Sequence, residues 1–201
     1  MRILDRVKLG GLIGALVVLT VLGNAGQSSL AQQTTKFRWD LVSIQGSNPP
    51  TLEAGGVAFA LANDGSTLKL TGSGTFDQAN PTVVTGGGDW TSFNPDGNET
   101  GKGTYKVTGL VRFQEAPGKI PTGALNDKIG TIADARAGLV ALRIAFSDGS
   151  EGVLFVNCHL PEGSPTSIGE GITVSKGFVM FNRMPPVPGV DANRTVFHVL
   201  R

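Results

Sequence analysis

The residues best suited to chemistry lie together at the end of one apolar run. The stretch GVLFVNCHL, residues 152–160, places the only cysteine, Cys158, directly before one of the two histidines, His159. A thiol beside an imidazole could be a nucleophilic pair, part of a metal site, or simple packing. Successive side chains on a strand point to opposite faces, so these two cannot face each other if the run is a strand. We therefore interpret Cys158 as a packed apolar residue.

The orientation of this run depends on the turn before it. Asp-Gly at 148–149 is the preferred pair for a two-residue hairpin turn, because glycine adopts positive φ freely and aspartate tolerates it. With that turn, Asn157 and His159 point into the core and Cys158 points to the other face. A three-residue loop with a glycine bulge instead places Cys158 in the core beside Val156. We favour the two-residue turn and keep the second register as the alternative.

Four residues are candidate ligand contacts. His159 and Asn157 come first, because two polar side chains aimed into an apolar interior could orient a small ligand. His198 lies in the C-terminal run TVFHVL and joins them if that strand lies beside theirs. Trp90 follows three glycines and is a candidate for an aromatic surface that faces a ligand. A metal site needs a third or fourth ligand, which no spacing supplies, so we predict no metal and no cofactor.

These candidates must be positioned by strands. In FRWDL, Phe37, Trp39 and Leu41 alternate with Arg38 and Asp40, which is typical of a half-buried antiparallel strand. Similar patterns predict about nine strands with turn signals between them. The runs are FRWDL (37–41), GVAFALA (56–62), STLKLTGSGTF (66–76), GDWTSF (88–93), GTYKVTGLVRF (103–113), GLVALRIAFS (138–147), GVLFVNCHL (152–160), ITVSKGFVMF (172–181) and TVFHVL (195–200). Only TIADARAGL (131–139) could form a helical turn.

The fold class follows from these strands and from 29 glycines. We predict an all-β fold, a single antiparallel barrel of about 8–9 strands, with a β-sandwich as the alternative. The barrel is favoured because closure removes exposed edges and glycines near strands allow curvature and bulges.

Two further patterns fix expected registers and faces. A two-residue turn at Asp-Gly 64–65 pairs Leu61 with Leu68 and puts the large apolar residues of that hairpin on one face. In GTYKVTGLVRF, alternation places Val111 on the same face as Val107 and Phe113.

The first 31 residues are expected to be a signal peptide. Basic residues in MRILDRVK precede the apolar run LIGALVVLTVLG, and SSLA supplies small residues before a cleavage site between Ala31 and Gln32. The apolar run is shorter than the roughly 20 residues that a spanning helix needs. We therefore predict a single all-β domain over 32–201 that is secreted or periplasmic, with no membrane association after cleavage.

The charge argues against two classes of partner, and the cysteine content excludes an internal disulfide. Without residues 1–31 the chain has 14 basic and 15 acidic residues, a net charge near −1, which argues against nucleic acid or an anionic membrane as partner. One cysteine cannot form an internal disulfide, so the core must hold the fold. NET at Asn98 and NRT at Asn193 match the glycosylation sequon, which matters only in a host that uses it.

One resemblance concerns the glycine-rich segments. LTGSGTF (70–76) followed by VTGGGDW (84–90) resembles the glycine-rich strand pairs of the allene oxide cyclase and dirigent β-barrels. That resemblance implies binding of small hydrophobic molecules and oligomer formation. It covers about 50 residues and carries no catalytic motif, so we assign no family.

Three functions are consistent with these observations. The leading hypothesis is a non-catalytic module that binds a small apolar or amphipathic ligand, with His159 and Asn157 as polar contacts. The second is a cyclase or isomerase that uses the same pocket, in which a histidine moves a proton, although no catalytic signature is found. The third is a structural or assembly subunit, a homo-oligomer that uses the face around Cys158, Ala141 and Ala145 as its interface.

Overall fold

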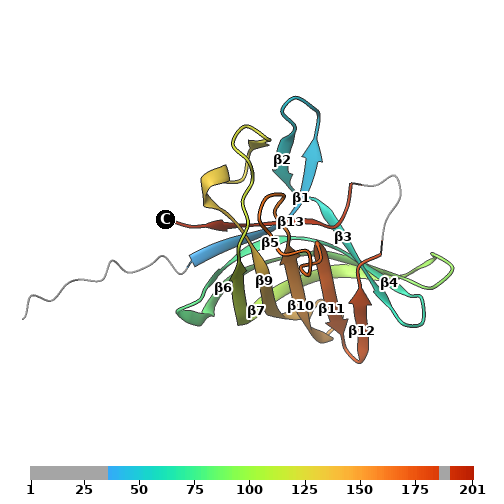
Figure 1. Ribbon diagram of the computed structural model, residues 1–201. Coiled ribbons are helices and arrows are strands. Elements are labelled where there is room, and N and C mark those ends of the chain that lie inside the picture. Colours follow the sequence, from blue (N-terminus) through green and yellow to red (C-terminus); the bar gives the residue numbers. More distant parts are fainter. Residues whose placement is uncertain (1–35, 186–190) are drawn as a thin grey trace, which may run out of the picture. The chain divides into compact units, whose positions relative to one another are not determined.

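The described protein is all-β, and its thirteen strands belong to one sheet (Figure 1). The computed structural model describes residues 36–185 and 191–201, so the predicted signal peptide over 1–31 lies outside the described residues. The strands are β1 (Lys36–Gln45), β2 (Thr51–Ala54), β3 (Val57–Ala62), β4 (Thr67–Thr71), β5 (Ser73–Asp77), β6 (Asn80–Phe93), β7 (Glu99–Ala116), β8 (Asn126–Asp127), β9 (Ala135–Phe146), β10 (Glu151–Cys158), β11 (Gly171–Lys176), β12 (Val179–Arg183) and β13 (Arg194–Val199). None of the described residues forms a helix long and apolar enough to cross a membrane.

All nine predicted runs contain strands. Two of them are divided at a glycine with positive φ, Gly72 between β4 and β5 and Gly177 between β11 and β12. The segment predicted to form a helical turn contains the 3-10 turn η1 (Ile132–Asp134). The short strands β2 and β8 were not predicted, because neither has a long enough apolar alternation to be recognised.

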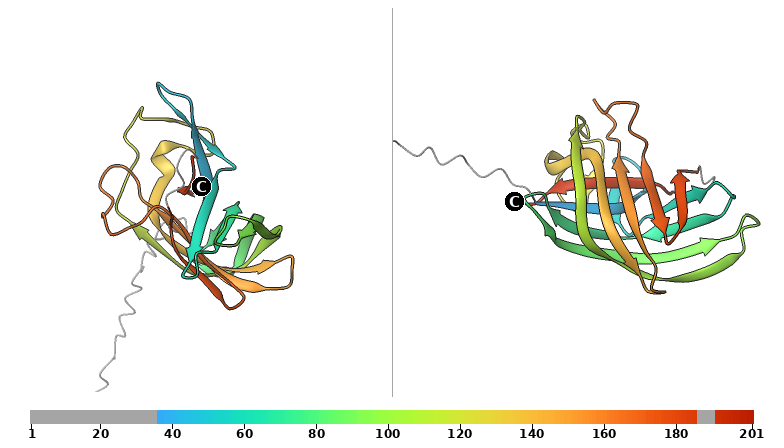
Figure 2. Two further views of the ribbon diagram at one scale, coloured as in Figure 1. Left: turned by 90° about the vertical axis from the view of Figure 1, so that its right-hand side faces the viewer. Right: turned by 90° about the horizontal axis from the view of Figure 1, so that it is seen from below.

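The strand pairings return to their starting point. From β10 the ladder passes through β11, β12, β3, β4, β6, β7 and β9, and β9 pairs again with β10. Each of these pairings is antiparallel. A second route leaves β9 through β13, β1 and β5 and reaches β6. The long strands β6, β7 and β9 thus belong to both routes, while β1 and β13 run side by side across β9 and β10 (Figure 2).

All three Asp-Gly pairs lie in three-residue hairpin loops, which corrects the two-residue turns predicted at 64–65 and 148–149. The loops are 63–65, 95–97 and 147–149. In each, the backbone N–H of the residue before the loop donates to the backbone oxygen of the residue after it, with N–O distances of 2.9, 2.9 and 2.8 Å. The loop glycines have φ of 88°, 82° and 89°, whereas no aspartate in the described chain has positive φ. Aspartate therefore stays in its ordinary conformation and only glycine occupies the left-handed region.

The longer loops change the register by one residue. Leu68 pairs with Ala60 instead of Leu61, so the buried residues of β3 are alanines and its larger side chains are only half-buried. Leu142 likewise pairs with Leu154, which places Cys158 with Val156 in the core, as in the alternative register. Pairing large apolar residues across the hairpin was therefore the wrong criterion for its register, because the buried positions of β3 are all alanines.

Strand β7 departs from simple alternation. Register shifts interrupt its pairing with β9 between Val107 and Gly109 and between Leu110 and Arg112. As a result Leu110 is buried and Val111 is 50% exposed, so the prediction that Val111 faces the core is wrong. A bulge adds one residue to one strand and so reverses the faces beyond it.

The β1–β13 pair is buried on both faces. Phe37, Trp39 and Leu41 lie in the core as predicted, and the indole of Trp39 passes so close to Gly74 that a Cβ there would lie 2.8 Å from Nε1. The opposite face is also covered, since Asp40 on it is fully buried. The carboxylate of Asp40 accepts two hydrogen bonds from the guanidinium of Arg38, each 2.8 Å long. This second buried face of the pair carries the candidate site.

Candidate functional site

Cys158 is part of the core. Its side chain is fully buried in one cluster with Val140 and Val156, and its Sγ donates a hydrogen bond to the backbone oxygen of Thr195 at 3.3 Å. Burial, together with the negative charge of Glu170, raises the pKa of the Cys158 thiol well above its ordinary value. A neutral, buried thiol is a poor nucleophile. The interpretation of Cys158 as a packed residue is confirmed.

A cavity of about 130 Å³ lies beside this point, on the second buried face of the β1–β13 pair. It is formed by β1, β2, the loop after β7, the chain that follows β10, the residue before β11, and β13. Most of its lining is apolar, and its polar side chains are His159, Glu170, Arg194 and Thr195. The apolar residues are Val42, Ile44, Leu52, Ile120, Leu125, Leu160, Pro161 and Val196.

Glu170 is the centre of a hydrogen-bond network at this cavity. Its Oε2 accepts the backbone N–H of His159 at 2.5 Å, and its Oε1 accepts the backbone N–H of Thr195 at 2.6 Å. The β10–β11 ladder ends at the pair Asn157 and Gly171, and beyond this end the carboxyl group of Glu170 accepts hydrogen bonds from the residue after β10 and from β13. Two backbone donors that the sheet leaves unpaired are thereby satisfied.

The hydroxyl of Thr195 indicates where a proton can reside. Its Oγ1 lies 2.6 Å from the backbone oxygen of Asn157 and 3.0 Å from Oε1 of Glu170. A hydroxyl has one hydrogen, so it can donate to only one of these acceptors. If it donates to Asn157, the nearer one, a proton on Glu170 completes the contact by donating to Thr195. The network therefore suits a protonated carboxyl group as well as an ionised one.

The electrostatics agree with this geometry. Burial raises the pKa of Glu170 to about 7, against the opposing effect of the hydrogen bonds from His159 and Thr195 and of the charge of Arg194. Arg194 is itself paired with Asp191, which limits its stabilisation of the carboxylate. A carboxyl group with a pKa near 7 can donate or accept a proton at neutral pH, which is the property required of a binding anchor or of a general acid or base.

The predicted ligand contacts are only partly brought together. His159 lines the cavity, whereas Asn157 is buried beside it and contributes its backbone oxygen to the network. Asn157 shares the face of β10 opposite Cys158 with Phe155, and His159 lies just beyond the end of the strand, which corrects the prediction that Asn157 and His159 point into the core. The interface predicted around Cys158 and Ala141 is not a single face of the sheet, because Cys158 lies on the face opposite to that of Ala141 and Leu139. Ala141 is buried, and Leu139, near it on β9, is 37% exposed.

His198 lies on the same face of β13 as Arg194 and Val196 but does not line the cavity. It is 2% exposed, and its Nε2 lies 2.8 Å from Oδ2 of Asp127, whose Oδ1 accepts two backbone N–H groups. Its Nδ1 has no hydrogen-bond partner within the described chain. Across the described residues, no group of three or more His, Cys, Asp or Glu side chains is arranged to hold a metal ion.

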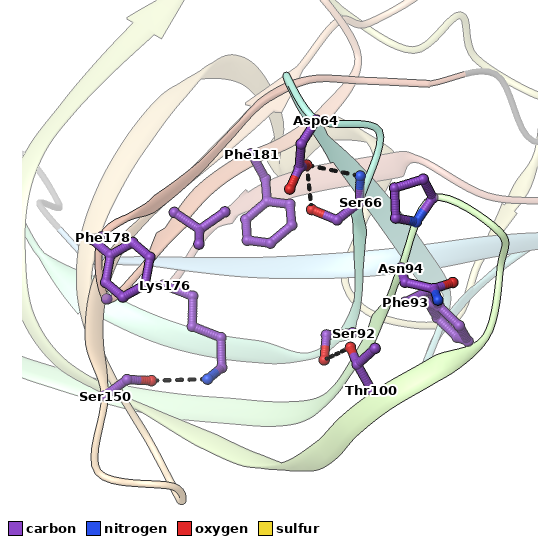
Figure 3. A pocket seen from close by; sticks show the side chains of 13 residues that line it. Asp64, Ser66, Ser92, Phe93, Asn94, Thr100, Ser150, Lys176, Phe178 and Phe181 are labelled. Carbon is purple, nitrogen blue, oxygen red and sulfur yellow. Dashed lines mark hydrogen bonds between the residues drawn. The ribbon is translucent and has the colours of Figure 1, made fainter.

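Trp90 is distant in sequence and in environment from these residues. It is buried in β6, with its ring edge-on to Phe146 at 6.0 Å and under the ammonium group of Lys176 at 4.3 Å. Lys176 lines a second, wider cavity at the hairpin loops, in which the side chain of Trp90 takes no part (Figure 3).

Glu170 and Thr195 were missed by sequence reasoning. Glu170 lies in EGSPTSIGEG, a segment that reads as a loop rich in turn residues, where a carboxylate is ordinarily solvated. Its partners are 11 and 25 residues away along the chain. No local signal identifies such a residue, because Glu170 meets these partners only once distant segments of the chain come together in the fold.

Comparisons with protein-family models, with curated proteins and with solved structures found no match to this chain.

Proposed function

We propose that this protein binds a small amphipathic molecule, with the apolar end of the ligand in the cavity and its polar head at Glu170. The observation that carries the proposal is a partly buried ionisable side chain in the wall of a mostly apolar cavity. Apolar pockets with a few convergent polar groups are the usual form of small-molecule sites. His159, Arg194 and Thr195 supply the remaining polar side chains of the lining.

The size of the cavity limits what enters it. A volume of about 130 Å³ is below the roughly 300–1,000 Å³ of sites that enclose a whole ligand. The ligand therefore places one short apolar group among residues such as Leu52 and Leu125, and the rest of it lies outside.

The head group is a cation or a neutral hydrogen-bond donor. Glu170 above its pKa carries a negative charge that Arg194, already paired with Asp191, balances only in part. An anionic head would add a second negative charge in a poorly solvated place, which is unfavourable.

The proposal includes a barrel and export. The closed circuit of eight antiparallel strands, with the β9–β10 pairing as its last step, supports a β-barrel. Export rests on the signal-peptide pattern of residues 1–31, and removal of that segment would leave β1 intact because β1 begins at Lys36.

The test compares three probes with the same tail and different heads: hexylamine, hexanol and hexanoate. Binding is followed by NMR shifts of the backbone amides of His159 and Thr195 in the chain 32–201. At pH 8 we expect saturable binding of hexylamine and weaker binding of hexanoate by about tenfold or more. Equal binding of hexanoate and hexylamine, or no saturable binding of any probe, would contradict the proposal.

Variants separate the site from the rest of the molecule. Glu170→Gln should remove the preference for hexylamine, whereas Glu53→Gln, which neutralises an exposed carboxylate on β2, should retain it. Leu125→Phe fills the cavity without changing Glu170 and should weaken all three probes. This second variant keeps the test decisive if Glu170→Gln does not fold.

A second candidate function is an isomerase or cyclase, favoured by one observation, a carboxyl group in the cavity wall, Glu170, whose pKa burial raises to about 7. A carboxyl group with that pKa is suited to proton transfer at neutral pH. An enzyme would lose turnover in Glu170→Gln and keep its affinity for neutral ligands, whereas a binding module would show no turnover in either form.

A further inference from the structure

A second cavity, of about 440 Å³, lies where four hairpin loops meet. Asp64, Pro95 and Ser150 reach it from or beside the three Asp-Gly loops, and Phe178 reaches it from the tip of the β11–β12 hairpin. It shares no lining residue with the cavity beside Glu170. Any function of this cavity is therefore independent of the proposal above.

Aromatic side chains form part of its wall. Phe178 and Phe181 lie on one side of the cavity and Phe93 with Asn94 on the other (Figure 3). Phe181 is buried, whereas Phe178 is fully exposed at its hairpin tip. An aromatic ring in this position offers a whole apolar face to whatever enters the cavity.

Polar groups with unused hydrogen-bonding capacity face the same space. Ser66 donates its N–H and its hydroxyl to Oδ1 of Asp64, at 2.9 and 2.7 Å, and Oδ2 of Asp64 has no hydrogen bond to the described chain. Asn94 accepts the N–H of Asn98 with its Oδ1 at 2.9 Å, and its side-chain amide donates no hydrogen bond within residues 36–185 and 191–201. A carboxylate acceptor and an amide donor are thus left for a ligand.

The charge of the cavity argues against an anionic ligand. Its ammonium group, on Lys176, is already paired with Asp148, donates to Ser150 at 3.0 Å, and lies over the rings of Trp90 and Phe146. The carboxylate of Asp64 is exposed and unpaired with any cation of the described chain. A ligand that enters therefore meets a negative group and no free positive one.

We propose that this cavity is a binding site for a neutral saccharide. A sugar ring has an apolar face of C–H groups, which packs on an aromatic ring such as Phe178, and a rim of hydroxyls that both donate and accept hydrogen bonds. Asp64 can accept from a hydroxyl and Asn94 can donate to its neighbour. The volume of about 440 Å³ lies within the roughly 300–1,000 Å³ of small-ligand sites.

The experiment is an NMR titration of the chain 32–201 with maltose and with cellobiose, two neutral disaccharides that differ in their glycosidic bond. Saturable shifts of the amides of Ser66, Asn94 and Phe178 by either disaccharide are the expected result. Shifts by neither, or tighter binding of the anion glucuronate than of both, would overturn the proposal.

Two substitutions on the same hairpin make the test specific. Phe178→Ala should weaken disaccharide binding about tenfold or more, and it should not affect folding because the ring contacts solvent. Met180→Ala is the matched control, since Met180 is also exposed, at 53%, but does not line the cavity. Equal affinities of these two variants would show that the shifts arise elsewhere and would refute the site.

Discussion

Glu170 can carry either a negative charge or a proton in the wall of a mostly apolar cavity, and the surroundings act differently on the two states. The charged form loses hydration but accepts N–H groups from His159 and Thr195. The protonated form avoids the desolvation penalty and still completes the contact with the Thr195 hydroxyl. Because burial is the larger effect, the pKa of Glu170 rises to about 7.

This raised pKa makes stability depend on pH. Between the ordinary value of 4.5 and about 7 the folded chain holds a proton on Glu170 that the unfolded chain has lost. The free energy of unfolding therefore falls as pH rises through this window, and the contribution of Glu170, fully present below pH 4.5, decreases by up to about 3 kcal/mol. Urea unfolding of the wild type at several pH values between 4.5 and 8 measures the slope.

The variant Glu170→Gln isolates this contribution. Its difference in unfolding free energy from the wild type should change steadily between pH 4.5 and 7, because the glutamine side chain does not titrate. Asp40, whose pKa is also raised by burial, is present in both proteins and cancels. Glu53→Gln should retain the wild-type slope. A constant difference between Glu170→Gln and the wild type across this range would show that Glu170 is ionised throughout.

At the scale of single residues, the sequence identified some environments and not others. Packing of Cys158 could be predicted because one thiol without partners behaves as a small apolar side chain. His159 and Asn157 were predicted to point into the core, which is wrong because that orientation depended on the length of the preceding loop. Glu170 could not be found, because its burial depends on β13, which follows it by more than 20 residues.

The hairpins show why strands could be located from the sequence more easily than their pairing registers could be predicted. Alternation and glycine spacing indicated the strands, but each register depends on a single residue of loop length. In the three Asp-Gly loops the glycine alone has positive φ, so one additional residue precedes it in the loop. The sequence Asp-Gly is compatible with both loop lengths, and packing against other strands decides between them.

The loop 95–97 allows a direct test of this conformation. Gly97 has φ of 82° and no atom near the position of an added Cβ, so Gly97→Ala measures only the backbone cost, about 1 kcal/mol. Asp96 has no positive φ, so Asp96→Ala should change the free energy of unfolding by less than about 0.5 kcal/mol. Urea denaturation of both variants provides the comparison. A similar loss in both would indicate a two-residue turn, in which both positions need positive φ.

At the scale of the whole described domain, one connected set of buried side chains forms the core. This core cluster extends from Phe37 in β1 to Phe197 in β13, and it includes residues of most strands between them. The all-β class could be predicted from periodicity. The strand order could not, because pairings such as β12 with β3 join segments more than 100 residues apart, and local patterns contain no information on them.

A single core predicts a single unfolding transition. Trp39 and Trp90 are the only tryptophans, and they lie in different strands of the same cluster. In Trp39→Phe, fluorescence reports on β6, and in Trp90→Phe it reports on β1. Each substitution removes an indole N–H that has no hydrogen-bond partner in the described chain, so neither breaks a hydrogen-bond network.

Within each variant, fluorescence and far-UV circular dichroism should give the same urea midpoint, as expected for one cooperative unit. Separate midpoints in Trp39→Phe or in Trp90→Phe would mean that the β1–β13 pair and the long strands unfold independently.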